Sequence, residues 1–330
     1  MGEQNTSQVS AGNQANLEVF SDTLQCLAET NRNIVVVTSD SRGSGKLTPF
    51  GKKYPAQHIE VGIAEQNLVG VAAGLASAGK TVFAVSPACF LATRALEQIK
   101  NDVAYSNNPV KLIGISAGVS YGALGSTHHS LHDYAALRAI NNLTVIAPAD
   151  NFETRQAILK AAEINQPFYI RFGKKAMPLL QTESESEFTI GKGRLIAEGA
   201  DLTIIATGET VYPALQAAQL LREEFAINAS VVSMHTIKPL DYELIETLAS
   251  NGAPIITVEE HSINGGLGEA CASFLMQNGF TNRFRIVGIP DEYTVTGSQT
   301  EILTHYGISQ KAIAKTALQL LERKPEMIEV

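Results

Sequence analysis

The sequence predicts an α/β fold in which two doubly wound, mostly parallel sheets form two consecutive domains. Short runs such as NIVVVTSD (33–40) and VKLIGIS (110–116) are almost continuously apolar, as expected for strands buried on both faces. Helical segments separate these runs, which is the order that parallel sheets require. The 330 residues, 45% of them hydrophobic, suffice for about two such domains.

The first domain is expected over residues 16–180, after a flexible polar tail at 1–15. Its strands are predicted at 33–40, 80–86, 110–116, 143–149 and 167–173, with a further strand that ends near residue 62. Its helices are predicted at 64–79, 90–106 and 151–165. The acidic segment QTESESE opens a linker at 181–190, since it has no apolar periodicity. A second, smaller domain is expected over 191–330. Its strands are predicted at 201–208, 229–237 and 253–261, and its helices at 211–225, 241–250, from about 266, and 309–323.

Ligands of such folds bind at the carboxyl ends of the strands. The usual phosphate signatures GxxxxGK[ST] and GxGxxG are absent between a strand and a helix. Two glycine-rich loops remain. SRGSGK (41–46) either contacts a ligand, with Ser44 as the candidate, or is only a turn. GGLGEA (265–270) either binds an anion at a helix start or packs closely against the sheet.

Composition argues against several classes of partner. The net charge of −8 comes without a Lys/Arg cluster, so no nucleic-acid partner is predicted. No apolar run reaches the roughly 18 residues of a membrane span, and the first residues lack the apolar core of a signal peptide. Cys26, Cys89 and Cys271 show neither metal nor disulfide spacing, which fits the reducing cytoplasm.

Glu65 lies in HIEVGIAEQN (58–67), between a strand-like run and a helix of small residues. A carboxylate in such apolar surroundings needs a partner or a function. The helix N-terminus would favour its charge through the helix dipole, so Glu65 is either a structural carboxylate of this helix or a functional group.

Five segments carry further information: VGIAEQNLVGVAAGLASAGKTVFAVS, TRALEQIKNDVA, YGALGSTHHSLHDYAALRAI, TVIAPAD and TIKPLD…VEEHSINGGLGEA. In this order and spacing they resemble the C-terminal half of transketolases and deoxyxylulose-phosphate synthases, over about residues 16–325. The resemblance implies a pyrimidine-binding domain, a transketolase C-terminal domain and the cofactor thiamine diphosphate.

The resemblance also implies roles in cofactor binding. The family's glutamate at the position of Glu65 hydrogen-bonds N1′ of the aminopyrimidine, where a carboxyl favours the imino tautomer that acts as a base. Arg94 and Gln98 match the family's cofactor-binding pattern. The aromatic ring that stacks on the pyrimidine is expected three residues before the arginine, where Leu91 stands. The adjacent Phe90 is therefore either this ring or a core residue.

Substrate contacts are implied in two further segments. GSTHHS matches the family's G-x-T-H-Q loop, so His128 is expected near the substrate carbonyl, where it can move a proton or stabilise charge. His129 is a second candidate contact, or is structural. With His132 these residues lack the spacing of a zinc site, and no metal site is predicted in this chain. Arg171 in FYIRFG matches an arginine that grips the substrate phosphate, or forms a salt bridge at the sheet edge.

Two positions depart from the family pattern. Leu124 stands where transketolases carry an acidic residue that contacts the sugar C2 hydroxyl, and Ser116 replaces a histidine of the phosphate site. The sugar is therefore left open between pentose phosphates, a branched sugar phosphate such as apulose phosphate, and a sulfonated sugar.

The family's GDG…N motif, which holds Mg²⁺ against the cofactor diphosphate, is absent from this sequence. The resemblance thus implies a separate N-terminal subunit that binds Mg²⁺, an α2β2 assembly, and transfer of a two-carbon ketol unit from a ketose to an aldose phosphate. Two alternatives are the β subunit of a 2-oxo acid dehydrogenase E1 and a non-catalytic regulatory or scaffold subunit.

Overall fold

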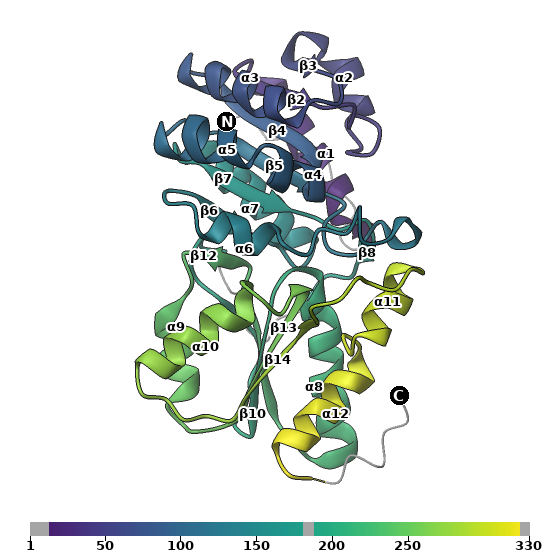
Figure 1. The fold of residues 1–330 in the computed structure, drawn as a ribbon, viewed down its shortest axis with the longest axis vertical. Coiled ribbons are helices and arrows are strands. Elements are labelled where there is room, and N and C mark those ends of the chain that lie inside the picture. Colours follow the sequence, from purple (N-terminus) through teal and green to yellow (C-terminus); the bar gives the residue numbers. More distant parts are fainter. Residues whose placement is uncertain (1–12, 181–187, 324–330) are drawn as a thin grey trace, which may run out of the picture.

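The computed structural model describes residues 13–180 and 188–323, so most of the predicted tail and linker lie outside the described residues. Figure 1 shows two α/β bodies stacked along the long axis, the first in purple to teal and the second in green to yellow. Both contain a mostly parallel sheet, which confirms the predicted fold class.

The first sheet has the strand order β12-β6-β7-β5-β4-β2-β3 and is parallel except at β12. Its strands are β2 (Ile34–Thr38), β3 (His58–Glu60), β4 (Thr81–Pro87), β5 (Lys111–Ile115), β6 (Thr144–Ile146), β7 (Phe168–Arg171) and β12 (Thr236–Lys238). A short antiparallel pair, β1 (Gln14–Ala15) with β8 (Ala176–Met177), lies beside it. Continuous burial of β2, β5 and β7 explains their apolar sequences.

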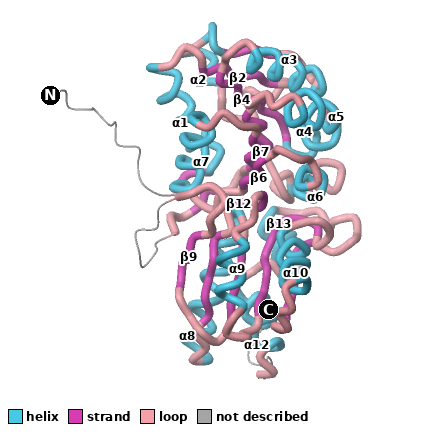
Figure 2. Tube along the Cα trace, turned by 90° about the vertical axis from the view of Figure 1, so that its left-hand side faces the viewer, coloured by secondary structure: helices cyan, strands magenta, loops and turns pink. Residues whose placement is uncertain are grey.

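Helices cover both faces of this sheet, as Figure 2 shows. One face packs against α1 (Asn16–Thr30) and α7 (Asn151–Glu163), and the other against α3 (Glu65–Ser77), α4 (Ala88–Arg94), α5 (Leu96–Gln98) and α6 (Asp133–Arg138). The short helices are α2 (Thr48–Lys53), η1 (Pro55–Gln57) and η3 (Gly122–Leu124), with a π-helical turn η2 at Ile99–Tyr105.

The second sheet has the order β14-β13-β10-β11-β9, with β9 antiparallel to the rest. Its strands are β9 (Arg194–Ala197), β10 (Leu202–Ala206), β11 (Ala229–Ser233), β13 (Ile255–Ser262) and β14 (Phe284–Ile289). Its helices are η4 (Gly208–Thr210), α8 (Val211–Phe225), α9 (Tyr242–Ala249), α10 (Leu267–Gln277), α11 (Gln299–His305) and α12 (Gln310–Leu320).

Two predicted elements are divided in the structure. The helix predicted at 90–106 becomes α4, α5 and the π-helical turn η2. The strand predicted at 229–237 becomes β11 in the second sheet and β12 at the edge of the first. The second domain therefore supplies an edge strand to the first, and the boundary predicted near residue 190 does not separate the two sheets. No helix among the described residues is long and apolar enough to cross a membrane.

Candidate active site

The candidate site lies at the carboxyl ends of the strands of the first sheet, where the α/β rule places ligands. The turn after β3 leads into α3, α4 follows β4, and longer loops follow β5 and β7. Gly62 has a positive φ of 74°, which favours glycine at this reversal between β3 and α3. The backbone N–H of Gly62 donates to Glu60 Oε1 at 2.9 Å, which fixes the turn just before Glu65.

Glu65 is the first residue of α3, as the sequence predicted, and only 4% of it is exposed. Arg94 Nη1 donates to both carboxylate oxygens at 3.1 Å. The Arg94 side chain is 49% exposed and the Glu65 side chain 3%, so the ion pair joins a buried carboxylate to a guanidinium at the protein surface. The helix N-terminus and this guanidinium together stabilise the buried carboxylate.

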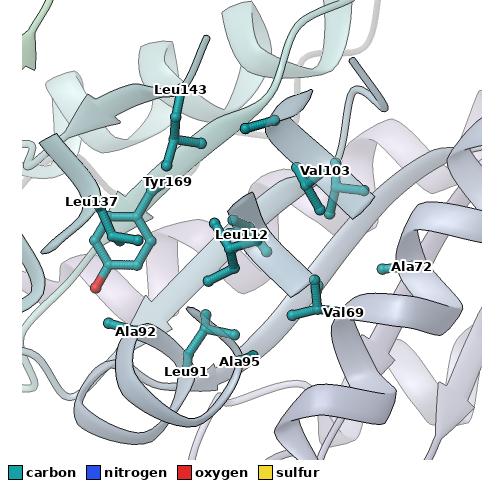
Figure 3. Packing of buried hydrophobic residues seen from close by; sticks show 14 of the residues in the cluster. Val69, Ala72, Leu91, Ala92, Ala95, Val103, Leu112, Leu137, Leu143 and Tyr169 are labelled. Carbon is teal, nitrogen blue, oxygen red and sulfur yellow. The ribbon is translucent and has the colours of Figure 1, made fainter. Parts of the chain in front are cut away.

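The structure distinguishes Phe90 from Leu91. Leu91 is fully buried in the cluster that contains Val69 and Leu112 (Figure 3), so the structure favours Phe90 over Leu91 as the cofactor contact. Phe90, on another face of the same helix, is half-buried, and its ring centroid lies 4.2 Å from Arg94 Cζ. Neighbouring helical residues point about 100° apart, and the sheet under α4 decides which of them is enclosed. Phe90 is the aromatic ring available beside Glu65.

Gln98 lies four residues after Arg94, at the end of α5. Its Oε1 atom is buried and has no hydrogen-bond partner. A buried acceptor without a partner is costly and is most often explained by a water or ligand that satisfies it. Its predicted role in cofactor binding stays a prediction, with this unpaired oxygen as its support.

His128 lies in the loop between β5 and α6. Its ring makes edge contacts with Phe90 at a centroid distance of 5.3 Å and with Tyr121 at 5.4 Å. The ring Nδ1 is 2.9 Å from Thr127 Oγ1. Three segments far apart in the sequence thus bring Glu65, Phe90 and His128 into one region, linked through Arg94 and the aromatic rings.

Sequence reasoning missed two residues here, Tyr121 and Lys174. Lys174 Nζ lies 3.8 Å from the centroid of the Tyr121 ring, whose edge in turn faces His128. Burial lowers the pKa of Lys174 from its ordinary value, although the residue stays accessible. Among the described residues no carboxylate forms an ion pair with its amine. The sequence did carry a signal for Lys174, because it lies three residues after the end of β7, in a loop at the carboxyl end of a parallel strand.

Arg171, the last residue of β7, is the cation that the sequence selected for the substrate phosphate, but the structure favours its alternative role. It is 6% exposed, and Nη1 donates to Asp133 Oδ1 at 2.8 Å while Nη2 donates to the carbonyl oxygen of Glu260 at 2.7 Å. Burial alone would raise the pKa of Asp133, but the Arg171 charge and further hydrogen bonds outweigh it and lower this pKa. A guanidinium that is buried and paired with these partners is poorly placed to grip a phosphate.

The surroundings of His129 favour its structural alternative over a substrate contact. It is 2% exposed, Nδ1 lies 2.6 Å from Thr294 Oγ1, and Nε2 lies 3.0 Å from the carbonyl oxygen of Gly122. Both ring nitrogens are therefore used within the fold. His132 is exposed at the N-terminus of α6.

In both glycine-rich loops several backbone amides already donate to acceptors of the protein. In SRGSGK, the amides of Gly45, Lys46 and Leu47 donate to carbonyls of the same loop, and exposed Ser44 donates to the Ser41 carbonyl at 3.2 Å. This pattern is that of a turn, and no contact places Ser44 in the site. In GGLGEA, the amides of Leu267 and Gly268 donate to the carboxylate of Glu259, and Gly268 packs closely on Ile286. An acidic side chain of the protein already occupies the helix start.

Across residues 13–180 and 188–323 no three His, Cys, Asp or Glu side chains are arranged to hold a metal ion. Cys26, Cys89 and Cys271 are free thiols.

Comparisons with known proteins address the family directly. Residues 13–178 match the transketolase pyrimidine-binding domain, and residues 191–313 match the transketolase C-terminal domain. The chain belongs to the transketolase family. An apulose-4-phosphate transketolase subunit of Phocaeicola vulgatus is 48% identical over 304 residues, covering 92% of this chain and 96% of the relative. The 6-deoxy-6-sulfo-D-fructose transketolase subunit SqwH of Clostridium sp. is 35% identical over 308 residues, covering 93% and 94%.

A solved split-gene transketolase, described as an inactive β4 tetramer, has a TM-score of 0.83 with this chain at 37% identity. The match covers 94% of this chain and 99% of the other. The transketolase family implies thiamine diphosphate, and the residues present fit one end of that cofactor. A carboxyl at Glu65, the half-buried ring of Phe90 and the unpaired oxygen of Gln98 offer hydrogen bonds and stacking to an aminopyrimidine.

Proposed function

We propose that this chain is the C-terminal subunit of a heteromeric, thiamine-diphosphate-dependent transketolase that transfers a two-carbon ketol unit from a ketose to an aldose phosphate. The observation that carries this proposal is the convergence of Glu65, Phe90 and His128 at the strand ends of a transketolase pyrimidine-binding domain. Each belongs to a different segment, and only the fold brings them together.

When bound, thiamine diphosphate supplies the nucleophilic carbon and the electron sink that ketol transfer needs. Glu65 holds a proton between its carboxyl and a ring nitrogen of the pyrimidine, which shifts that ring towards its basic tautomer. Phe90 orients the pyrimidine by stacking, and Gln98 accepts a hydrogen bond at its free oxygen. Arg94 pairs with the Glu65 carboxylate, and its half-exposed side chain leaves it room to withdraw when the pyrimidine is in place.

His128, whose ring is held beside Phe90 at the strand ends, would donate a proton to the alkoxide that forms when the substrate carbonyl is attacked, and would remove the proton from that hydroxyl when the carbonyl forms again. Lys174 replaces Arg171 as the proposed anchor of the substrate's anionic group. Lys174 and its neighbour Lys175 are both exposed cations of the loop after β7, but it is Lys174 that lies against Tyr121, next to His128, and a flexible ammonium attracts phosphate as a point charge.

The proposal includes an N-terminal partner subunit with the GDG…N motif, which would bind Mg²⁺ and the cofactor diphosphate in an α2β2 assembly. Two observations support a partner. The relatives of matching length are themselves named as transketolase subunits. Ile63 and Leu124, close in sequence to Glu65 and His128, are 74% and 54% exposed, and apolar side chains so placed are suited to burial under another chain.

The free thiols suit the reducing cytoplasm, where we place the reaction.

The sugar is proposed to be a branched or sulfonated ketose or aldose phosphate rather than an ordinary pentose phosphate. Leu124 offers no carboxylate to a sugar hydroxyl and Ser116 offers no imidazole. The two relatives are named for apulose-4-phosphate and for 6-deoxy-6-sulfo-D-fructose. These names define the first substrates to assay.

The test combines the purified chain with the candidate GDG…N subunit, thiamine diphosphate and Mg²⁺, and measures ketol transfer from a panel of ketoses. Ketol transfer by the mixture and not by either chain alone is the expected result. Glu65→Ala and His128→Ala should each abolish most turnover, whereas Glu29→Gln, an exposed carboxylate paired with Lys53 on the surface, should leave it unchanged. Turnover by this chain alone, or full activity of Glu65→Ala, would refute the proposal. Decarboxylation of 2-oxo acids without ketol transfer would replace it with a dehydrogenase β subunit.

A further inference from the structure

The loop that carries His128, residues 118–130, is held by the C-terminal domain as well as by its own. The backbone N–H of Val119 donates to Glu260 Oε1 at 2.8 Å, and Gln299 Nε2 donates to the same oxygen at 3.0 Å. Thr294 Oγ1 lies 3.0 Å from Ser126 Oγ and 2.6 Å from His129 Nδ1. These contacts join the loop to residues more than 130 positions later in the sequence.

The two domains also approach closely at two glycines of the loop. A Cβ atom on Gly118 would lie 2.3 Å from Glu260 Cδ, and one on Gly122 would lie 2.6 Å from the carbonyl oxygen of Gly297. Both glycines have positive φ, at 59° and 51°. Side chains are thus sterically excluded at both points, and the loop lies directly on the C-terminal domain.

The hydrogen-bond directions around Thr294 follow from its partners. A carbonyl oxygen can only accept, so His129 Nε2 carries the proton donated to Gly122. Burial lowers the pKa of His129, which keeps the ring neutral and makes Nδ1 an acceptor. Thr294 must then donate to Nδ1 and accept from Ser126. These hydrogen bonds form a series from Ser126 through Thr294 and His129 to Gly122. His128 lies within the loop segment that this series holds closed.

We propose that Thr294 is a positioning residue for the reaction, through which the C-terminal domain fixes the loop and with it the ring of His128. This inference rests on the proposed function, since it gives the C-terminal domain a task only if His128 faces the reacting carbonyl. Thr294 itself is 8% exposed and acts through the loop rather than on substrate.

The test compares Thr294→Val with Thr294→Ser in the enzyme reconstituted with its partner. Valine keeps the shape of threonine but leaves buried His129 Nδ1 without a donor, whereas serine keeps the hydroxyl. We expect kcat to fall roughly tenfold to a hundredfold for Thr294→Val, because small displacements of a catalytic group are this costly. The KM for thiamine diphosphate should change less than about twofold, and Thr294→Ser should restore kcat to near the original value. Ser126→Ala, on the accessible side of the loop, should give a smaller loss in the same direction.

A second readout needs no activity. Hydrogen exchange of this chain alone should become faster in residues 119–130 of Thr294→Val, where the amides of His128 and His129 donate to Gly125, and stay unchanged in α12. Uniformly faster exchange in both domains, or equal effects of valine and serine, would overturn the inference. If His128→Ala abolishes turnover and Thr294→Val leaves kcat unchanged, this inference fails alone. If His128→Ala keeps full turnover, the proposed role of His128 fails first.

Discussion

Truncation of two neighbouring residues, Phe90 and Leu91, should have opposite consequences. Leu91→Ala is expected to destabilise the fold and spare cofactor binding, whereas Phe90→Ala is expected to spare the fold and weaken cofactor binding. The pair makes a matched comparison, because both residues lie on α4 and both changes leave alanine.

The magnitudes follow from the surroundings of each side chain. Leu91 is 0% exposed and packs in the cluster with Val69 and Leu112 (Figure 3), so alanine leaves a cavity and costs about 2–5 kcal/mol of unfolding free energy. Phe90 is half-buried, and its ring contacts the Arg94 guanidinium and the edge of His128. The loss of these two contacts should lower the unfolding free energy by only about 1–2 kcal/mol.

Urea unfolding of this chain alone, followed by circular dichroism, measures the first effect. Titration of thiamine diphosphate into the complex with the partner subunit measures the second. Loss of one stacking ring should weaken cofactor binding by roughly tenfold, whereas Leu91→Ala should leave the binding constant within about twofold.

The reasoning is refuted if Leu91→Ala weakens cofactor binding while its unfolding free energy stays unchanged. It also fails if Phe90→Ala unfolds at much lower urea and binds the cofactor normally. Either result would mean that the exposed and enclosed faces of α4 are assigned the wrong way round.

Three further perturbations test individual groups. Arg171→Met should lower the unfolding free energy of this chain alone by about 3–5 kcal/mol, because it removes the ion-pair partner of the buried Asp133 carboxylate. A variant with normal stability and a raised substrate KM would instead support Arg171 as the phosphate-binding residue. Lys174→Met should raise the KM for a phosphorylated substrate by roughly tenfold with kcat little changed, and equal kinetics on phosphorylated and unphosphorylated sugars would exclude it as the anion anchor. Burial raises the pKa of Glu209 from 4.5 to about 8, so its stabilising contribution is complete below pH 4.5 and lost as pH rises towards 8. Glu209→Gln should therefore flatten this part of the stability curve, by on the order of a few kcal/mol between pH 5 and 8, and identical pH curves from urea titrations of both proteins would contradict the assignment.

Local pattern is sufficient for most elements of the fold. The continuous apolar runs at 33–40 and 110–116 become β2 and β5, because a strand covered on both faces can tolerate few polar residues. The immediate neighbours of Glu65 predict a helix start, and the residue is found there. The clearest local failure is the strand predicted at 229–237, whose second half joins the other sheet as β12.

The candidate site is predicted less evenly, because residue type alone does not say where a side chain points. Phe90 and Leu91 are adjacent and both apolar, and only the sheet beneath α4 encloses one of them. Arg171 carries the charge that a phosphate needs, but its guanidinium donates to the Asp133 carboxylate and to the Glu260 carbonyl oxygen, which come from two other segments. The place of Lys174 in the loop after β7 marks it as a candidate, but the sequence does not show that its amine reaches Tyr121.

By itself the sequence determined the fold class, the family and the position of Glu65, because each depends on periodicity or on motifs that neighbouring residues carry. The tertiary structure alone decided which histidine is available, which cation is committed, and that Thr294 reaches the loop of His128. Those properties depend on contacts between residues 38 to 165 positions apart, and hydrogen bonds of that range are fixed by packing rather than by local pattern.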